Sequence, residues 1–494
     1  MNIINKLRKN IRLSLGRLGS LEKPVNVASA PQRGASSHLR RGGGLGVGPI
    51  IDAAHQACSR LFPIFLILHS SLFTFHFSLF IFHSSPARAD VWDIVCSDSL
   101  RIDTTRTGQL HAQVNSLAFF HNNEYSSDLA KGYTLPGAWL QPKLIYTPHP
   151  QIQLEAGAHL LLFNGANRYP NYAFHDVARW KGHQYQRGIH VLPWFRAQAD
   201  FRNLTLVLGN IYGAQNHQLI LPLYNPEQNL STDPEMGFQL LWQRPRLHFD
   251  VWINWQSYIF NLDTHQEAFT VGLNSTIRWN RPDTQKRLRW ETPIQVLIQH
   301  RGGELDTTNV GVQTVANIAL GARATYRPHH SITPSPHHSI TPSSHHSITP
   351  SSHHSITSPL SAISAEANLL LSYQQHGTLW PFDTGFALHT ALSATLWERL
   401  TAQVGYVAIP RRYANLYGQP YFGTLSIRYH NLTFRGMHTA YATVDYSHCF
   451  TPAYRLGAQF TLYSANSHDL HTLPISFGIY LRLCPDFRLW KKKE

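Results

Sequence analysis

One histidine and three carboxylates share the richest irregular stretch of the chain. Residues 209–237 read GNIYGAQNHQLILPLYNPEQNLSTDPEMG and contain His217, Glu227, Asp233 and Glu235. Carboxylate and carbonyl oxygens are the ligands that Ca²⁺ takes, but the spacing here matches no EF-hand loop. A loop of this kind can also narrow a pore or contact a ligand. The composition favours an ordered structural loop, with constriction or ligand contact as the second interpretation and a calcium site as the third.

A serine and a histidine stand side by side in Tyr446-Ser447-His448. Ester hydrolysis by a barrel enzyme needs a nucleophile and a base that face each other. Adjacent residues of a strand point to opposite faces, which is poor geometry for such a pair. The sequence also lacks a G-x-S-x-G motif. We therefore expect no enzymatic activity and no cofactor.

A repeat of period 8 carries eight of the 31 histidines. HHSITPSP at 329 is followed by HHSITPSS at 337 and 345 and by HHSITSPL at 353. Neutral imidazole suits Zn, Cu and Ni, which would make this a metal-capturing loop. The histidine pairs have no neighbouring Cys or carboxylate, however. We interpret residues 329–360 as a low-complexity insert in a surface loop, and its deletion should leave folding intact.

The N-terminal region predicts export. Residues 61–83 carry no charge, and Ala87-Arg88-Ala89 fits a small-x-small cleavage site. We interpret residues 61–89 as a signal peptide cleaved before Asp90. A retained anchor helix is the alternative, because the apolar run is long enough to span a bilayer. Residues 1–60 are atypical for an exported protein, and we interpret them as an extension upstream of the true translation start. Residues 90–494 would then form the mature domain.

Charged residues are sparse, and most of the excess of positive charge lies before the mature domain. The sequence has 42 Lys and Arg against 28 Asp and Glu, a net charge of +14, and only 14% of its residues are charged. Residues 1–89 hold 11 basic and 2 acidic residues. The remainder is too weakly basic to indicate a nucleic-acid binder, and so low a charged fraction argues against an ordinary soluble enzyme. Four cysteines exclude a disulfide scaffold, and they leave open whether Cys449 and Cys484 pair.

Alternating apolar and polar residues recur through the mature domain. In residues 247–259, apolar side chains from Leu247 to Trp255 fall on one face, whereas His248 and Asp250 fall on the other. Such segments have the length of membrane-spanning strands rather than that of globular strands. Because about 17 segments are found and bacterial barrels have even strand numbers, we expect an all-β fold. It would be a transmembrane antiparallel β-barrel of about 16 strands (14–18). The alternative is a soluble protein of two β-sandwiches.

The same pattern predicts particular strands and connections. Residues 421–430 and 432–446 predict two strands joined by a tight turn at 429–432. Residues 121–137, 164–189 and 213–236 predict long connections, which, like the repeat, we expect on the extracellular side. The polar faces of the strands supply the candidates for lining a pore: His248, Asp250, Arg428, His430, Arg435, Asp445, Arg455 and Arg482.

The stretch from Gly209 to Leu273 resembles a known family. It runs from GNIYGAQNHQLILPLYNPEQNLSTDPEMGFQLLWQ to DVWINWQSYIF and DTHQEAFTVGL. These phrases are similar to an uncharacterised family of porin-like outer-membrane proteins from Bacteroidales-type bacteria, and the resemblance covers roughly residues 108–490. It implies a porin-like barrel and assigns no functional residue. The chain departs from the family pattern in its His-rich insert, its N-terminal extension and its end, where Trp490 is followed by KKKE.

Taken together, these features predict a porin-like channel in the bacterial outer membrane for passive diffusion of small hydrophilic solutes. The cationic excess among the pore-lining candidates predicts a mild anion preference. An adhesin or receptor barrel with a closed lumen is the alternative function, and a barrel lipid hydrolase is the third. The expected partners are outer-membrane lipid, the solutes and the barrel-assembly machinery, with no nucleic acid. A homo-oligomer would be in keeping with other porins.

Overall fold

The computed structural model describes residues 90–163, 189–259, 265–280, 287–303, 310–328, 359–429 and 431–492. The N-terminal extension, the signal peptide and most of the repeat lie outside these residues, so those interpretations stay predictions.

The strands are β1 (Gln109–Ser126), β2 (Lys131–His149), β3 (Ile152–Phe163), β4 (Ile189–Phe201), β5 (Leu204–Asn210), β6 (Met236–Arg244), β7 (Leu247–Ser257), β8 (Ala268–Arg278), β9 (Leu288–Arg301), β10 (Gln313–Tyr326), β11 (Leu360–His376), β12 (Thr384–Leu396), β13 (Leu400–Ile409), β14 (Met437–Thr451), β15 (Tyr454–Asn466), β16 (His471–Thr472), β17 (Ile475–Leu483) and β18 (Asp486–Lys491). The helical segments are α3 (Val91–Cys96), η1 (Thr104–Arg106), η4 (Ala214–His217), α5 (Gln228–Ser231) and η5 (Pro420–Phe422).

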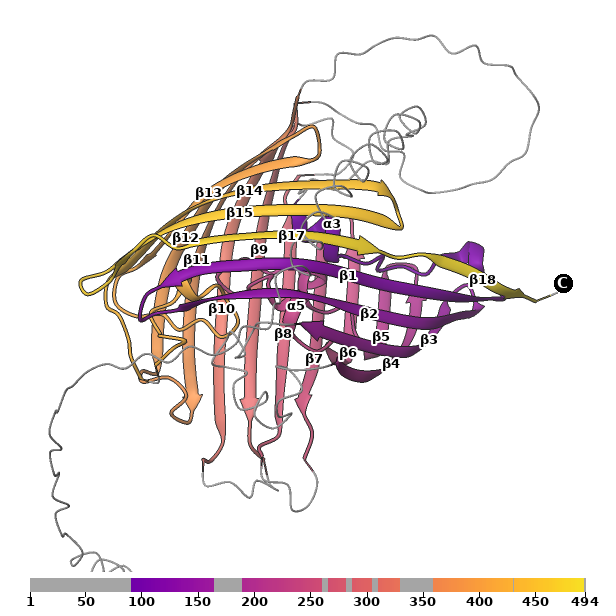
Figure 1. The fold of residues 1–494 in the computed structure, drawn as a ribbon, viewed down its shortest axis with the longest axis horizontal. Coiled ribbons are helices and arrows are strands. Elements are labelled where there is room, and N and C mark those ends of the chain that lie inside the picture. The colour runs from indigo at the N-terminus through magenta and orange to yellow at the C-terminus, as the bar shows by residue number, and fades with distance from the viewer. Residues whose placement is uncertain are drawn as a thin grey trace, which may run out of the picture. The chain divides into compact units, whose positions relative to one another are not determined.

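Hydrogen-bonded pairing closes the sheet on itself. Each strand from β1 to β15 runs antiparallel to the next, and β17 pairs with both β15 and β1. The ring is therefore a closed antiparallel barrel of 16 strands, which confirms the fold predicted from the sequence. β16 adds a short bridge beside β15, and β18 continues from β17 along the start of β1, toward the C-terminus in Figure 1. A closed ring has no open edge. A β protein that spans a bilayer needs such closure, because every backbone donor and acceptor must be paired within the protein.

The side chains of the wall alternate as the sequence predicts. In β7, Asp250 and Trp252 point into the barrel and are almost wholly buried, whereas Trp255 on the opposite parity is 39% exposed. Large apolar residues such as Val191 in β4 and Leu208 in β5 are exposed on the outer face of the barrel. The barrel therefore carries an apolar outer surface, whereas its inner surface combines polar side chains with buried apolar ones.

The first two strands are longer than the sequence suggested. Residues 121–137 do not form a long connection, because β1 runs to Ser126 and β2 begins at Lys131 after a tight turn. His121 and Asn123 look like loop residues in the sequence, yet both are buried and face the interior. Polar residues are acceptable in these strands because the inner face of the barrel is polar.

Residues 421–429 do not form a strand, and the described residues do not contain the predicted hairpin with residues 432–446. β14 begins only at Met437, and the stretch before it is an irregular connection that contains η5. The alternation of Leu425 and Ile427 matches a strand, but both pack against the buried interior cluster instead of facing outward. Arg428 and Arg435 consequently lie in a connection rather than on a strand.

The two ends of the barrel differ in their connections. At one end, which we call the short-turn end, tight turns join β2 to β3, β4 to β5, β6 to β7, β12 to β13 and β14 to β15. The opposite, long-connection end carries the links from β5 to β6 and from β13 to β14. β10 ends and β11 begins at the short-turn end. The repeat therefore joins β10 to β11 at the end opposite to the links from β5 to β6 and from β13 to β14, whereas we expected all the long connections on one side.

Two long connections fold into the lumen and meet there. Residues 211–235 and 410–436 are joined by a parallel bridge between Tyr224 and Tyr417. The Tyr417 hydroxyl contacts β8 through Thr270 (2.7 Å). Two residues later, Gln419 donates to Tyr463 of β15 (2.7 Å) on another part of the wall. The connections thus reach across the barrel, and an apolar cluster fills the space between them.

Two smaller findings concern a membrane helix and the cysteines. No helix among the described residues is long and apolar enough to cross a membrane. Cys96, Cys449 and Cys484 are free thiols, so Cys449 and Cys484 do not form a disulfide in this structure.

Candidate functional site

Two neighbouring strands stop short at the long-connection end of the barrel. β5 has seven residues and β6 nine, against 13 in β4 and 11 in β7. The β4–β5 ladder ends at the pair Arg196–Gly209. Beyond it, Phe195 gives its N–H to the Asn210 side chain (2.8 Å). Pro193 lies two residues farther along this edge of β4. Because proline has no N–H, it leaves no unpaired donor there. The wall therefore has a notch between β4 and β7.

A cavity of about 220 Å³ lies at this notch. Its lining includes Pro193, Met236 and Trp255, which sit on the outer face of the barrel, and Met236 and Trp255 are each 39% exposed. It also includes His217 and Trp252, which are buried inside. Since the lining comes from both faces, the cavity passes through the wall and joins the interior to the outer surface.

His217 lies at the inner end of this cavity, and its side chain contacts three others. It ends the short helix η4, and the backbone turns sharply after it because Gln218 adopts a left-handed conformation. Its Nδ1 lies 2.7 Å from Asp250, and its Nε2 lies 3.3 Å from Glu235. Its ring stacks on Trp252 at a centroid distance of 3.4 Å. Both ring nitrogens and one ring face are therefore fixed.

These carboxylates keep the imidazole charged. Burial by itself would lower the pKa of His217, but Asp250 and Glu235 outweigh burial and raise that pKa to about 9. Asp250 is fully buried and also accepts a hydrogen bond from Gln239 (2.9 Å). At neutral pH, His217 is thus an imidazolium that can donate a proton.

Glu235 places a carboxylate beside His217 at the inner end of the cavity. One of its oxygens accepts the N–H of Ala214 (2.7 Å), and the other faces His217. The cavity therefore presents a proton donor and a proton acceptor side by side. This is the pairing that general acid–base chemistry needs.

The other loop candidates divide between two places. Asp233 lines the same cavity and lies 3.0 Å from His190. Glu227 lies instead in the lumen, where it accepts a hydrogen bond from Asn123 (2.9 Å) and contacts His121 (3.3 Å). Burial would raise the pKa of Glu227, but these polar partners lower it. Among the described residues, no group of three or more His, Cys, Asp or Glu is arranged to hold a metal ion.

The pore-lining candidates on strands do not surround one channel. His248 is half-buried on the inner face of β7, and Asp445 of β14 accepts a hydrogen bond from Gln459 (2.8 Å). Arg455 and Arg482 bind backbone carbonyls of the N-terminal segment. Asp250, also a candidate, binds His217.

The remaining pore-lining candidates lie elsewhere. Arg428 pairs with Asp128 at the barrel rim (3.3 Å), and Arg435 is exposed in the connection before β14. His430 lies outside the described residues.

Sequence reasoning did not bring the members of this site together. His217 and Glu235 were named as loop candidates, but Asp250 was named only as lining a pore. Trp252 was missed as a functional residue, although it falls on the polar face of an otherwise alternating strand. An aromatic residue at a polar position is the signal that could have found it.

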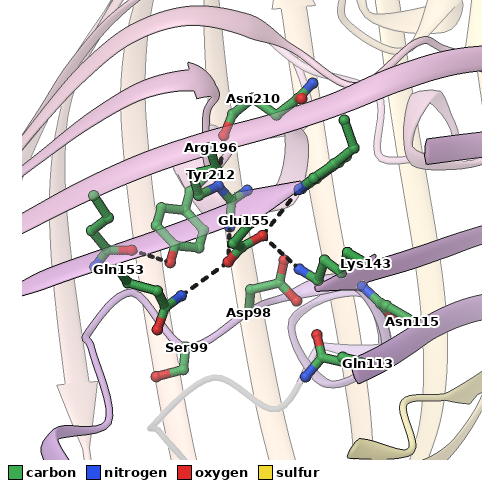
Figure 2. A network of polar contacts seen from close by, with 12 residues as sticks. Asp98, Ser99, Gln113, Asn115, Lys143, Gln153, Glu155, Arg196, Asn210 and Tyr212 are labelled. Carbon is green, nitrogen blue, oxygen red and sulfur yellow. Dashed lines mark hydrogen bonds and ion pairs between the residues drawn. The ribbon is translucent and has the colours of Figure 1, made fainter. Parts of the chain in front are cut away.

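A second polar network lies near the short-turn end (Figure 2). Glu155 of β3 pairs with Lys143 of β2 (2.9 Å) and with Arg196 of β4 (3.6 Å). Asp98 of the N-terminal segment lies beside Glu155 and Lys143 and forms an ion pair with Arg482. Burial would raise the pKa of Asp98, but Arg482 and the neighbouring cations lower it to about 2. The network fixes the N-terminal segment to the inner wall.

Comparison with known proteins adds a family. A family model described as "Lipid A 3'-O-deacylase-type" matches residues 102–340 and 348–492. The match overturns the expectation that the chain is not an enzyme, because that family is one of deacylases. The family that the match shows is this one, and the bacterial group expected with a porin-like family stays a prediction. No curated protein matches the sequence.

Several solved barrels are weakly similar. OccAB3 of Acinetobacter baumannii has a TM-score of 0.40 at 9% identity, covering 76% of this chain and 99% of that one. The outer membrane protein opdK of Pseudomonas aeruginosa has a TM-score of 0.40 at 9% identity, covering 77% and 100%. Likeness this weak carries no conclusion about function.

Proposed function

Because the chain belongs to the lipid A 3'-O-deacylase-type family, we propose that it is an outer-membrane hydrolase that removes an ester-linked acyl chain from a lipid A-type lipid. The observation that carries this proposal is the cavity through the wall. It brings the His217–Glu235 pair within reach of the apolar outer surface, where the acyl chains of a membrane lipid lie.

The apolar part of the cavity suits an acyl chain. Leu192, Leu219 and Leu297 line it together with Trp255 and Met236 at its outer end. An acyl chain that enters between these residues leaves water, which is favourable in proportion to the apolar area buried. Its ester group would then lie close to the charged pair at the inner end.

The donor His217 and the acceptor Glu235 can together hydrolyse an ester. Water attacks the ester carbonyl carbon while Glu235 accepts one of its protons. His217 gives its proton to the alcohol oxygen as the C–O bond breaks, so a fatty acid and an alcohol are released. The proton on Glu235 then passes to His217, which lies 3.3 Å away. Asp250 stabilises the imidazolium before its proton is given and after it is restored.

The filled lumen favours this function over a passive channel. A 16-stranded barrel can hold an aqueous channel. Here the connections 211–235 and 410–436 meet inside the barrel around a buried apolar cluster. The filled interior also fits the closed lumen that we associated with an adhesin or receptor, and the cavity at the notch favours the hydrolase over a receptor.

Substitution of the pair tests the proposal. His217→Gln and Glu235→Gln should each lower the rate of acyl release by about 100-fold or more, because each removes a proton donor or acceptor. His468→Gln is the matched control, since that histidine is exposed, lies on the connection after β15 and does not line the cavity. The rate is measured as fatty acid released from lipid A in detergent micelles. Equal rates in His217→Gln and the wild type would contradict the assignment.

A further inference from the structure

The segment that precedes the barrel, Asp90–Leu100, folds inside it. α3 buries Val91, Trp92 and Val95 against the inner wall. Trp92 packs on Tyr480 of β17 with ring centroids 4.6 Å apart. The close fit depends on Gly457 of β15, because a Cβ atom there would lie 2.4 Å from Val91.

Two arginines of the wall bind the backbone of this segment. Arg482 donates to the carbonyls of Val95 (2.9 Å) and Ser97 (3.0 Å). Arg455 donates to Ile94 (2.9 Å) and also to Ser97 (3.1 Å). The carbonyls at the end of a short helix have no partners within it, so these cations satisfy them.

The same segment binds the residues immediately before His217. Gln215 donates to the Asp93 carboxylate (2.7 Å). The N–H of Asp98 donates to the side chain of Asn216 (2.9 Å). Both bonds join parts of the chain that are more than 100 residues apart in sequence, and both reach η4, which ends at His217.

We propose that Asp90–Leu100 is a positioning segment for the catalytic histidine. It holds η4 from inside the barrel, so that His217 meets Glu235 and the inner end of the cavity. This inference rests on the proposed hydrolase function. Asp93 acts through Gln215 and touches no substrate, so its role is to position and not to catalyse.

The competing explanation is a plug that only closes or stabilises the barrel. Removing a plug would change stability without altering the rate of the chemical step. Removing a positioning contact should lower kcat and leave KM nearly unchanged, because the cavity that receives the acyl chain remains. It should also shift the alkaline limb of the pH–rate profile, since that limb reports the pKa of His217.

Three variants of the full chain separate these explanations. Asp93→Ala removes the hydrogen bond to Gln215 and should lower kcat about tenfold, the size expected for a small misplacement. Gly457→Leu should displace α3 and lower kcat further, with new protease cleavage near residues 90–100. Asp103→Ala is the control, because that exposed carboxylate binds Arg106 and does not contact η4. Unchanged kcat in the first two variants, with the segment displaced in Gly457→Leu, would overturn the proposal.

A second readout keeps the two proposals apart. If the wild type releases no fatty acid, the proposed function fails. The imidazole nitrogens of His217 can still be followed by NMR in the isotopically labelled protein. A His217 pKa that is lower in Asp93→Ala than in the wild type would support positioning by the segment. An identical pKa in both proteins would contradict it.

Discussion

His217 is held as a cation by two carboxylates, and this predicts how the protein responds to pH. Its pKa rises from an ordinary value of 6.5 to about 9 on folding. The stabilisation is therefore complete below pH 6.5 and is lost as pH rises through 9. Its size is at most about 3 kcal/mol, from the shift in pKa.

We expect both stability and acyl release to fall between these pH values. The midpoint of heat unfolding, seen as the gel shift of the folded barrel, measures stability. His217→Gln should lose this pH dependence of stability. A wild-type profile that stays flat from pH 6.5 to 9.5 would contradict the charged state of His217.

Gly272 allows Trp252 to stack on His217. A Cβ atom at residue 272 would lie 2.1 Å from the Trp252 ring. Gly272→Val should push the indole off the imidazole and lower the rate of acyl release by about tenfold or more. Gly303→Ala is the control, because the nearest atom there belongs to the Glu267 side chain. Fatty-acid release by the two variants measures the difference, and equal rates would show that stacking is unimportant.

Some residues of this site can be predicted from the sequence, but the contacts between them cannot. His217 and Glu235 were recognisable because they share one irregular stretch. Asp250 was recognisable as an inward residue of a strand. Their contact depends on how the connection 211–235 folds into the lumen, and alternation along a strand contains no information about that.

At the scale of the elements, alternation predicted the wall well and the connections poorly. The strand β7, Leu247–Ser257, matches the alternation of residues 247–259. Leu425 and Ile427 alternate in the same way but pack onto the interior cluster. An apolar face predicts burial, and it does not tell whether lipid or protein covers it.

Tyr417 anchors the inner connections to three strands. Its hydroxyl lies 2.7 Å from Thr270, 3.0 Å from Gln256 and 2.9 Å from Gln299. Tyr417→Phe leaves these buried groups short of a partner and should lower the free energy of unfolding by about 1–3 kcal/mol. Denaturant unfolding in detergent measures the change. Tyr373→Phe, at an exposed position on β11, should change it little, and equal losses in both variants would contradict the anchoring role.

At the scale of the whole barrel, the described residues form a closed ring of strands whose lumen is filled by the two long connections. A protein of this kind should give no discrete ohmic steps in a planar bilayer, in contrast to the channel that the sequence suggested. Conductance recording of the refolded residues 90–494 measures this. Regular steps that persist at low voltage would contradict a closed lumen.

The repeat interrupts the barrel at the short-turn end, whereas the cavity lies at the long-connection end. Deleting residues 329–358 should therefore leave both the gel shift of the folded barrel and the rate of acyl release unchanged. Loss of the folded species would show that the repeat is needed for assembly.

The central claim is that this barrel hydrolyses an acyl ester. The most direct measurement is mass spectrometry of lipid A after incubation with the refolded wild type. The account predicts loss of one acyl chain, with one equivalent of free fatty acid and one new hydroxyl group on the lipid. Intact lipid A in the presence of fully folded wild-type protein would contradict it.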